Sequence, residues 1–349
     1  MTIKLGKGVV PTTDTKLKLA GVLEVPPIAI GCWQWGDTKV WNWGEGSPKD
    51  AEEAFDTAYK LGIPFYDTAE EYGNGVSENQ IFRFREKYSE EEKAKQVIAT
   101  KFFPYSHRTE FPGVLLSALK DSLARLGIFK ADLYQIHAPI HPVEVEVVAE
   151  ALADAYDAGL IKTVGVSNYG IDEIKRMHGA LKKRNVLLAS NQISYSLTRT
   201  IPETSGLIKL CHNLGIAILA YSRKYHFFKS LKKNNIFTAL GMGILTGKYP
   251  PEGPFPKERQ ERFSVYDKTQ LSQLLGLLKR LGDKYQKTQS AIALNWCIAK
   301  GTIPLGGAKT AEHVKHNTEA LGFRLTEEEV SELDKLSFEG SNNNEWQHG

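Results

Sequence analysis

Cysteine and long apolar runs are both scarce in this sequence. The three cysteines, Cys32, Cys211 and Cys297, are widely spaced, and each lies in an apolar segment. We therefore expect reduced thiols in the core and no disulfide framework. No window approaches the roughly 18 uninterrupted apolar residues of a membrane-spanning helix, and the N-terminal residues lack the apolar core of a signal peptide. The sequence predicts a cytoplasmic protein without a membrane partner.

An excess of charge of one sign is also lacking, because 44 Lys and Arg face 41 Asp and Glu, for a net charge of +3. Proteins that bind nucleic acids usually show a stronger basic bias, so we expect no nucleic-acid partner. Hydrophobic residues make up 42% of the 349 residues, which allows a large core. We expect a monomer or a weak oligomer that acts on a small molecule and holds no metal.

Short apolar runs alternate with longer amphipathic segments, a pattern typical of repeated βα units around a parallel sheet. The predicted strands are Ile28–Trp33, Phe65–Thr68, Val97–Phe102, Leu133–His137, Thr163–Asn168, Leu188–Ser194, Ala217–Ser222 and Thr302–Leu305. The predicted helices are Lys49–Leu61, Glu78–Lys87, Val114–Leu126, Val143–Ala158, Ile171–Arg184, Glu203–Leu214, Thr288–Lys300 and Ala311–Leu321. Eight pairs favour one closed (β/α)8 TIM barrel, an α/β fold. The alternative is a doubly wound open sheet, but its glycine-rich dinucleotide fingerprint does not follow the first strand.

The ends of the chain add elements outside the eight repeats, within one domain over residues 1–349. A β-hairpin from Ile3–Leu5 and Leu17–Leu23 could plug the bottom of the barrel. An extra C-terminal helix is expected over Leu325–Leu336, where Thr326 and Glu329 can form a capping box. The polar, Asn-rich residues 340–349 predict a flexible tail.

Polar residues close three successive predicted strands, where barrel enzymes place their chemistry. Asp67, Lys101 and His137 end strands two, three and four, and Tyr72 follows Asp67 by five residues. A tyrosine with an ordinary pKa near ~10 is a poor acid at neutral pH, and a neighbouring ammonium favours its phenolate. Lys101 could supply that charge, Asp67 could orient it, and His137 could polarise a carbonyl group. Each residue alone is more often structural, and it is their combination that indicates a catalytic site.

The segment Asp67-Thr-Ala-Glu-Glu-Tyr-Gly73 matches the signature Asp-Thr-Ala-x-x-Tyr-Gly, so the chain resembles the aldo-keto reductase superfamily along nearly its whole length. The resemblance implies NADPH-dependent carbonyl reduction, with Asp67, Tyr72, Lys101 and His137 as a catalytic tetrad and the tyrosine as general acid. The implied cofactor is NADP(H).

The resemblance also implies residues that bind the nicotinamide end of the cofactor. Ser167, Asn168 and Gln192 would hydrogen-bond the carboxamide, and Tyr221 would stack on the ring. From the residues alone, Ser167-Asn168 could equally be a helix cap. The other cofactor-binding candidates are Gly31, Trp33, Ser222, Leu240, Gly241, Gly243, Lys248, Gly307, Lys309, Thr310, His313 and Asn317.

A phosphate site is expected after strand eight, where barrels commonly bind phosphate at a helix N-terminus. Lys309 could pair with the 2′-phosphate, which favours NADP over NAD, although it could also be an ordinary exposed lysine. The family often has Arg or Gln where His313 stands and Glu where His316 stands. These two departures concern the adenosine end of the cofactor.

An atypical insertion, Arg223–Ala239, interrupts the segment that in similar proteins runs Tyr-Ser-Pro-Leu-Gly after strand seven. We hypothesise a retained intron, because Arg223-Lys-Tyr225 can be encoded as C-GTAAGT-AC and Thr238-Ala239 as ACAG-CN. Excision would join C to CN and restore the missing proline codon in frame. The alternative is a genuine lid or interaction loop. A translated insertion would displace the pyrophosphate loop and weaken cofactor binding, or even give an inactive product.

Aromatic residues follow strands one and three and suggest a rim for an apolar aldehyde or ketone, although they could simply seal the barrel top. These are Trp33, Trp35, Trp41, Trp43, Phe102, Phe103 and Tyr105. Two other functions fit the same fold. One is a nucleotide-binding regulatory subunit similar to the β subunit of potassium channels, and the other is a Schiff-base lyase that uses Lys101 or Lys162 as its nucleophile.

Overall fold

The computed structural model describes residues 3–221, 241–254, 265–342 and 346–349. The insertion predicted at Arg223–Ala239 lies outside the described residues, and so do its neighbours Ser222 and Leu240. Within the described part of the chain, no helix combines the length and apolar character needed to cross a membrane.

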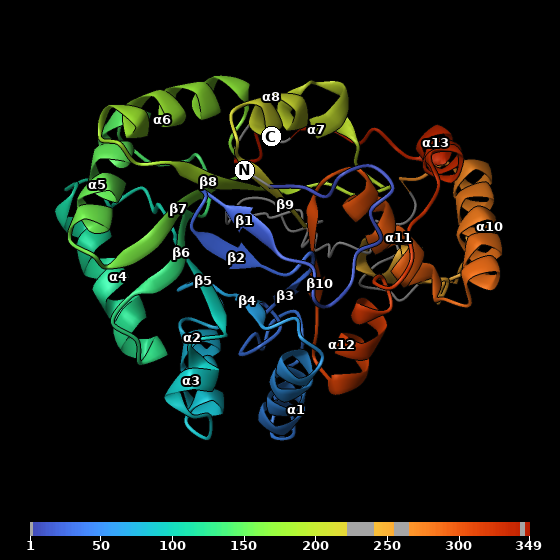
Figure 1. Cartoon of the computed structure of the whole chain (residues 1–349), viewed down its shortest axis with the longest axis horizontal. Coiled ribbons are helices and arrows are strands. Elements are labelled where there is room, and N and C mark those ends of the chain that lie inside the picture. The colour runs from blue at the N-terminus through green and yellow to red at the C-terminus, as the bar shows by residue number, and fades with distance from the viewer. Residues whose placement is uncertain (1–2, 222–240, 255–264, 343–345) are drawn as a thin grey trace.

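Eight parallel strands form a closed barrel in which β10 pairs with both β9 and β3 (Figure 1). This confirms the (β/α)8 barrel and excludes the open sheet. The strands are β3 (Ala29–Gly31), β4 (Phe65–Asp67), β5 (Val97–Phe102), β6 (Ala131–Ile136), β7 (Ile161–Ser167), β8 (Leu188–Ser194), β9 (Ala217–Tyr221) and β10 (Ile303–Gly307). Every predicted strand is found, with differences only at the ends.

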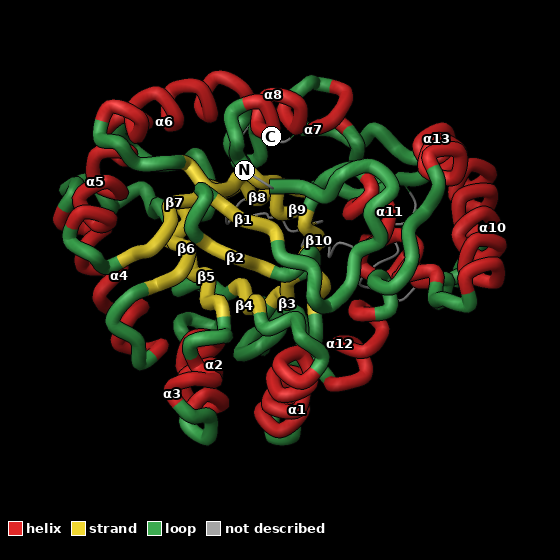
Figure 2. Tube along the Cα trace, in the orientation of Figure 1, coloured by secondary structure: helices red, strands yellow, loops and turns green. Residues whose placement is uncertain are grey.

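Helices surround the strands, as Figure 2 shows in red around yellow. They are α1 (Ser47–Lys60), α2 (Val76–Arg85), α3 (Glu90–Lys93), α4 (Gly113–Leu126), α5 (Val145–Asp157), α6 (Ile171–Lys183), α7 (Ile201–Thr204), α8 (Leu207–Asn213), α10 (Lys268–Tyr285), α11 (Gln289–Ala299), α12 (Ala311–Thr318) and α13 (Glu327–Leu336), with a 3-10 helix η1 (Gly241–Thr246). The helix predicted over Glu203–Leu214 is divided in two, because Gly206 between α7 and α8 has a φ of 84° that continues neither helix.

Helix α10 is an 18-residue element that the sequence analysis missed. Its leucines recur at helical spacing, and Leu271, Leu274 and Leu278 are buried. It lies beside α13 at the edge of the molecule (Figure 1). The capping box predicted at the start of α13 is confirmed, since Thr326 and Glu329 exchange backbone and side-chain hydrogen bonds.

The predicted hairpin is present, but its strands are β1 (Leu17–Leu19) and β2 (Leu23–Val25), and Ile3–Leu5 forms no strand. Leu17, Leu19 and Val25 are buried in a cluster with side chains from the beginnings of the barrel strands. Apolar contact therefore seals the barrel at its N-terminal end, as expected, and leaves the carboxyl ends of the strands as the mouth.

The end of the chain packs more closely than the flexible tail we expected over residues 340–349. The amide N–H groups of His348 and Gly349 donate to the carbonyl oxygen of Asn168 at 3.0 and 3.2 Å. Arg199, itself only 7% exposed, donates to the carbonyl oxygen of Gly349 at 2.8 Å. Trp346 is also buried. These long-range contacts hold residues 346–349 against the mouth, and no local sequence pattern indicates them.

Candidate active site at the mouth of the barrel

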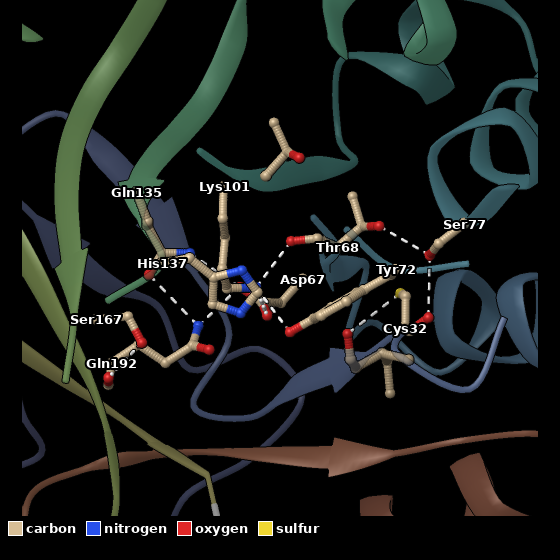
Figure 3. Close-up of polar contacts among 12 residues, drawn as sticks. Cys32, Asp67, Thr68, Tyr72, Ser77, Lys101, Gln135, His137, Ser167 and Gln192 are labelled. Carbon is tan, nitrogen blue, oxygen red and sulfur yellow. Dashed lines mark hydrogen bonds and ion pairs between the residues drawn. The ribbon is translucent and has the colours of Figure 1, made fainter. Parts of the chain in front are cut away.

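The four residues predicted as a catalytic tetrad meet at the mouth (Figure 3). Asp67 is the last residue of β4, Lys101 lies in β5, and His137 directly follows β6. Each of the four side chains belongs to a residue that is at most 5% exposed. Because neighbouring parallel strands end at one edge, three separate segments of sequence deliver these groups to one place.

Lys101 and Asp67 form a buried ion pair at the centre of the site. The Lys101 ammonium also donates to the Thr68 carbonyl oxygen at 2.8 Å and to Tyr72 Oη at 3.4 Å. Burial by itself lowers the pKa of Lys101, but the charge of Asp67 and the contact with Tyr72 outweigh burial and raise it. Lys101 therefore carries a positive charge next to the tyrosine hydroxyl at neutral pH.

Tyr72 lies on the loop between β4 and α2, which is held against a second loop. Gly73 has a φ of 59°, and a Cβ there would come within 2.7 Å of the Gly36 carbonyl. No larger residue fits this close approach. The Tyr72 ring centroid lies 5.6 Å from that of His137, at an edge-on angle of 74°. Both side chains consequently face the same space above the ion pair.

Two amide side chains complete the surroundings of Asp67. Gln135 Nε2 donates to Asp67 Oδ2 at 3.0 Å, and Gln192 Nε2 donates to the same oxygen at 2.8 Å. The sequence predicts a cofactor contact for Gln192 and indicates no role for Gln135. The alternation of side chains along β6 could have revealed it, because Gln135 precedes His137 by two residues and shares its face.

The residues predicted to bind a nicotinamide carboxamide lie together beside the tetrad. Asn168 Nδ2 donates to Ser167 Oγ at 2.9 Å and to the His137 carbonyl oxygen at 3.0 Å. The Tyr221 hydroxyl donates to Asn168 Oδ1, and Ser167 Oγ donates to the Gln192 carbonyl oxygen at 2.8 Å. This network fixes Asn168 with a φ of 67°, so the polar groups are oriented in advance.

Two glycines lie at the carboxyl ends of β3 and β10, on the other side of the mouth. Gly31 and Gly307 are paired across β3 and β10. A Cβ at Gly307 would lie 2.2 Å from Gln34 Nε2, so only backbone fits there. Asn317, which is 3% exposed, contacts the Gly307 carbonyl oxygen at 3.4 Å. The Gln34 side chain therefore occupies the space beside Gly307, which only a glycine leaves open to it.

Basic side chains gather at the N-terminus of α12. Thr310 caps the helix by accepting from the His313 N–H at 3.4 Å, and Lys309 Nζ donates to the Trp41 carbonyl oxygen at 2.8 Å. Desolvation lowers the pKa of His313; Glu312 opposes this, and the charges of His316, Lys309 and Lys248 lower it further. Lys248 and Lys309 therefore lie close enough to His313 to produce one electropositive region beside the helix N-terminus, which favours an anion.

The remaining predicted residues lie in η1 or among the aromatic side chains that follow β3 and β5. Gly241 and Gly243 lie in η1, whose Ile244 and Leu245 are buried. The ring centroids of Trp33 and Trp41 lie 5.6 Å apart in an edge-on contact, and those of Phe103 and His137 lie 5.5 Å apart. The Tyr105 hydroxyl donates a hydrogen bond to Glu71. These aromatic rings therefore border the site.

Trp35 and Phe102 do not belong to the rim that we predicted. Both are fully buried. Trp35 packs against Phe55 and Phe84 and donates its indole N–H to the Ala308 carbonyl oxygen at 2.8 Å. The alternation of side chains along a strand turns Phe102 to the outside of the barrel, where it packs beneath the helices.

Residues 27–337 match the model of the Aldo/keto reductase family. A protein named chloroplastic pyridoxal reductase from Arabidopsis thaliana is 35% identical over 332 residues, which cover 91% of this chain and 85% of that protein. The structure of a glycerol dehydrogenase from Gluconobacter oxydans superposes with a TM-score of 0.77 at 25% identity, covering 95% of this chain and 98% of the other.

An aldo-keto reductase from Klebsiella pneumoniae, solved in complex with NADPH, shares the fold with a TM-score of 0.69 at 21% identity, covering 94% of this chain and 96% of the other. The family match spans most of the chain, and the barrel carries the family's signature segment at its mouth. The chain therefore belongs to the aldo/keto reductase family.

Proposed function

We propose that the chain reduces an aldehyde or ketone to the alcohol with NADPH, and that Tyr72 is the general acid. The observation that carries this proposal is the position of Tyr72 Oη, 3.4 Å from a buried ammonium and beside the His137 ring. A carbonyl oxygen bound between the tyrosine and the histidine can accept hydrogen bonds from both, which polarises the C=O bond.

The chain's own residues account for the proton. When bound, the cofactor supplies a hydride to the carbonyl carbon. Tyr72 gives its phenolic proton to the carbonyl oxygen, and the Lys101 ammonium stabilises the negative charge left on Oη. Asp67 keeps that ammonium in place, and solvent reprotonates the tyrosine after the alcohol leaves. The high pKa of Lys101 argues against the Schiff-base lyase, whose nucleophile must be a neutral amine.

The site has the features that NADP(H) needs. The buried polar groups of Ser167, Asn168 and Gln192 can hydrogen-bond a carboxamide, and Gly31 and Gly307, at the paired ends of β3 and β10, can present backbone to the cofactor. Lys309, His313 and Lys248 can pair with a 2′-phosphate at the start of α12, which supports NADP over NAD. The family's NADPH complex from Klebsiella pneumoniae supports this choice of cofactor.

We propose an aromatic aldehyde of the pyridoxal class as the substrate. Trp33, Phe103 and Tyr105 border the site and can stack on a flat ring. The name of the Arabidopsis relative supports the same class, because that protein is 35% identical over most of its length.

The cytoplasmic location stays a prediction, to be checked by fluorescence of a tagged chain, since that relative is named as chloroplastic.

The proposal is tested by following NADPH oxidation with a panel of carbonyl compounds that includes pyridoxal, benzaldehyde and an aliphatic ketone. Full-length chain is compared with Tyr72→Phe and with a chain in which proline replaces Arg223–Ala239. Tyr72→Phe should lose turnover by about 10² to 10⁴ and still bind NADPH. Wild-type turnover in Tyr72→Phe contradicts the mechanism, and sequencing of the transcript decides between intron and insertion.

A further inference from the structure

Gln135 is a fully buried amide that touches the catalytic ion pair and has no place among the groups that bind cofactor or substrate. We propose that Gln135 is a positioning residue, which fixes Asp67 so that Lys101 stays within reach of the Tyr72 hydroxyl. This inference rests on the proposed function, because it concerns the proton-transfer half of that reaction.

The hydrogen bonds around Asp67 are divided between its two oxygens. Oδ1 is paired with the Lys101 ammonium, while Oδ2 accepts from Gln135 Nε2 at 3.0 Å and from Gln192 Nε2 at 2.8 Å (Figure 3). A carboxylate can only accept, so each amide must turn its nitrogen toward Asp67. Gln135 Oε1 in turn accepts from Gln192 at 3.4 Å. The two amides therefore hold one carboxylate oxygen away from lysine.

This division controls where the ammonium lies. Without Gln135, Oδ2 keeps only the donor from Gln192, so the carboxylate of Asp67 can rotate more freely and offer both oxygens to Lys101. That rotation strengthens the ion pair at the expense of the longer contact to Tyr72. That contact is 3.4 Å, the weakest of the three hydrogen bonds of Lys101. Small displacements at such a site change rates strongly, and a shift of about 1 Å can cost about 10²-fold.

The barrel leaves space for the Gln135 side chain at a glycine of the neighbouring strand. Gly165 on β7 is directly paired with Gln135 on β6. A Cβ at Gly165 would lie 2.9 Å from Gln135 Cγ and 2.5 Å from Ser190 Oγ. Only glycine at this position lets the Gln135 side chain turn along the barrel wall toward Asp67. The sequence Gly165-Val-Ser-Asn168 thus serves two purposes, since its later residues face the predicted carboxamide site.

Gln192 cannot replace Gln135 in this role. Its backbone carbonyl oxygen already accepts from Ser167 and from the Asn168 N–H, and its side chain reaches Asp67 from the predicted cofactor side. Its position is therefore coupled to the carboxamide site. Gln135 instead lies on β6, where it is paired with Lys101 of β5, and it contacts Asp67 from that side. Gln135 keeps the carboxylate in place independently of the cofactor.

The test compares Gln135→Met, which has nearly the same shape without a donor, with Gln135→Glu, which restores a donor only while protonated. The titratable groups around this position are Asp67, Lys101, Tyr72 and His137, together with Cys32, which directly follows β3 and interacts electrostatically with Asp67 and Lys101. The pH dependence of kcat, to which all these groups contribute, is measured first in wild type. Against that profile, Gln135→Met should lose about tenfold to 10²-fold in kcat at every pH.

Gln135→Glu should behave differently with pH. Beside a buried carboxylate the introduced carboxyl keeps its proton to a higher pH than usual, and in that form it donates to Asp67 as the amide does. Its kcat should approach the wild-type value at the acidic end of the range and fall as the pH rises. NADPH affinity, measured by fluorescence, should be unchanged in both variants. Equal losses in the two variants at every pH would indicate a merely structural role and overturn the proposal.

A matched control and a structural readout separate this proposal from the proposed function. Gln96→Met removes another buried glutamine, which is bound to Arg85 at 2.9 Å and lies at the opposite end of β5; its kcat profile should match wild type. A crystal structure of Gln135→Met should show Lys101 Nζ farther from Tyr72 Oη than in wild type, and an unchanged distance overturns the positioning role. A wild-type chain that reduces no carbonyl compound contradicts the proposed function, while the crystal structures still decide the role of Gln135.

Discussion

The Tyr72 hydroxyl accepts a hydrogen bond from the Lys101 ammonium at 3.4 Å, with both residues almost completely buried. Lys101→Met should therefore remove the charge that stabilises the phenolate and reduce kcat by about 10² to 10⁴. Because the pKa of Lys101 is raised, wild type should keep this contribution throughout the neutral range and lose it only above the ordinary lysine value of about 10.4. Steady-state kinetics across pH provide the measurement.

Stability needs a separate control in that experiment, since Lys101→Met leaves Asp67 buried without its partner, at a cost of about 3 to 5 kcal/mol. The double variant Asp67→Asn, Lys101→Met removes both charges and should regain much of this stability in urea unfolding. It should not regain activity. Recovery of turnover in the double variant would show that the lysine charge is dispensable.

Lys309 should determine the preference for NADPH over NADH. It lies beside Lys248 and His313 at the start of α12, where its charge can meet a 2′-phosphate. A charge-assisted hydrogen bond contributes about 1.5 to 3 kcal/mol, so Lys309→Gln should weaken NADPH binding by roughly tenfold or more and leave NADH binding nearly unchanged. Lys315→Gln, exposed on the same helix, is the control. A similar loss for both cofactors contradicts the assignment.

Residues 346–349 should support the cofactor site through Asn168. Two backbone N–H groups of this segment donate to the Asn168 carbonyl oxygen, and each such bond contributes about 1 kcal/mol. Deletion of the segment should weaken NADPH binding by up to about thirtyfold, as measured by fluorescence titration. His348→Ala keeps both N–H groups and removes the contact with Glu173, so it should bind NADPH much more tightly than the deletion variant.

His212 should make the fold sensitive to acid. Desolvation and the charge of Lys4 lower its pKa to about 4, whereas an unfolded histidine titrates near ~6.5. The unfolded state therefore takes up the proton first, and stability falls as the pH drops from about 6.5 toward 4. Between pH 7 and 5 this histidine should account for about 1 kcal/mol after solvent screening. In urea unfolding, His212→Gln should show a smaller loss than wild type over that interval.

The sequence was sufficient to predict the barrel and the meeting of Asp67, Tyr72, Lys101 and His137, because strand ends in a βα repeat converge by topology. Two features around the candidate site escaped prediction for physical reasons. Gln135 looks like any polar residue in a strand, and its role depends on an oxygen of Asp67 from a different strand. The contacts of residues 346–349 depend on Arg199 and Asn168, far away in the chain, while their composition resembles a loose end.

The packing of the last residues also affects how the protein should be produced for any of these experiments. A purification tag fused after Gly349 would begin beside Arg199 and the carbonyl oxygen of Asn168, close to the candidate active site. A tag placed ahead of Ile3 would instead begin near the hairpin that closes the other end of the barrel. Kinetic constants measured on a chain tagged at the carboxyl end would therefore include an effect of the tag.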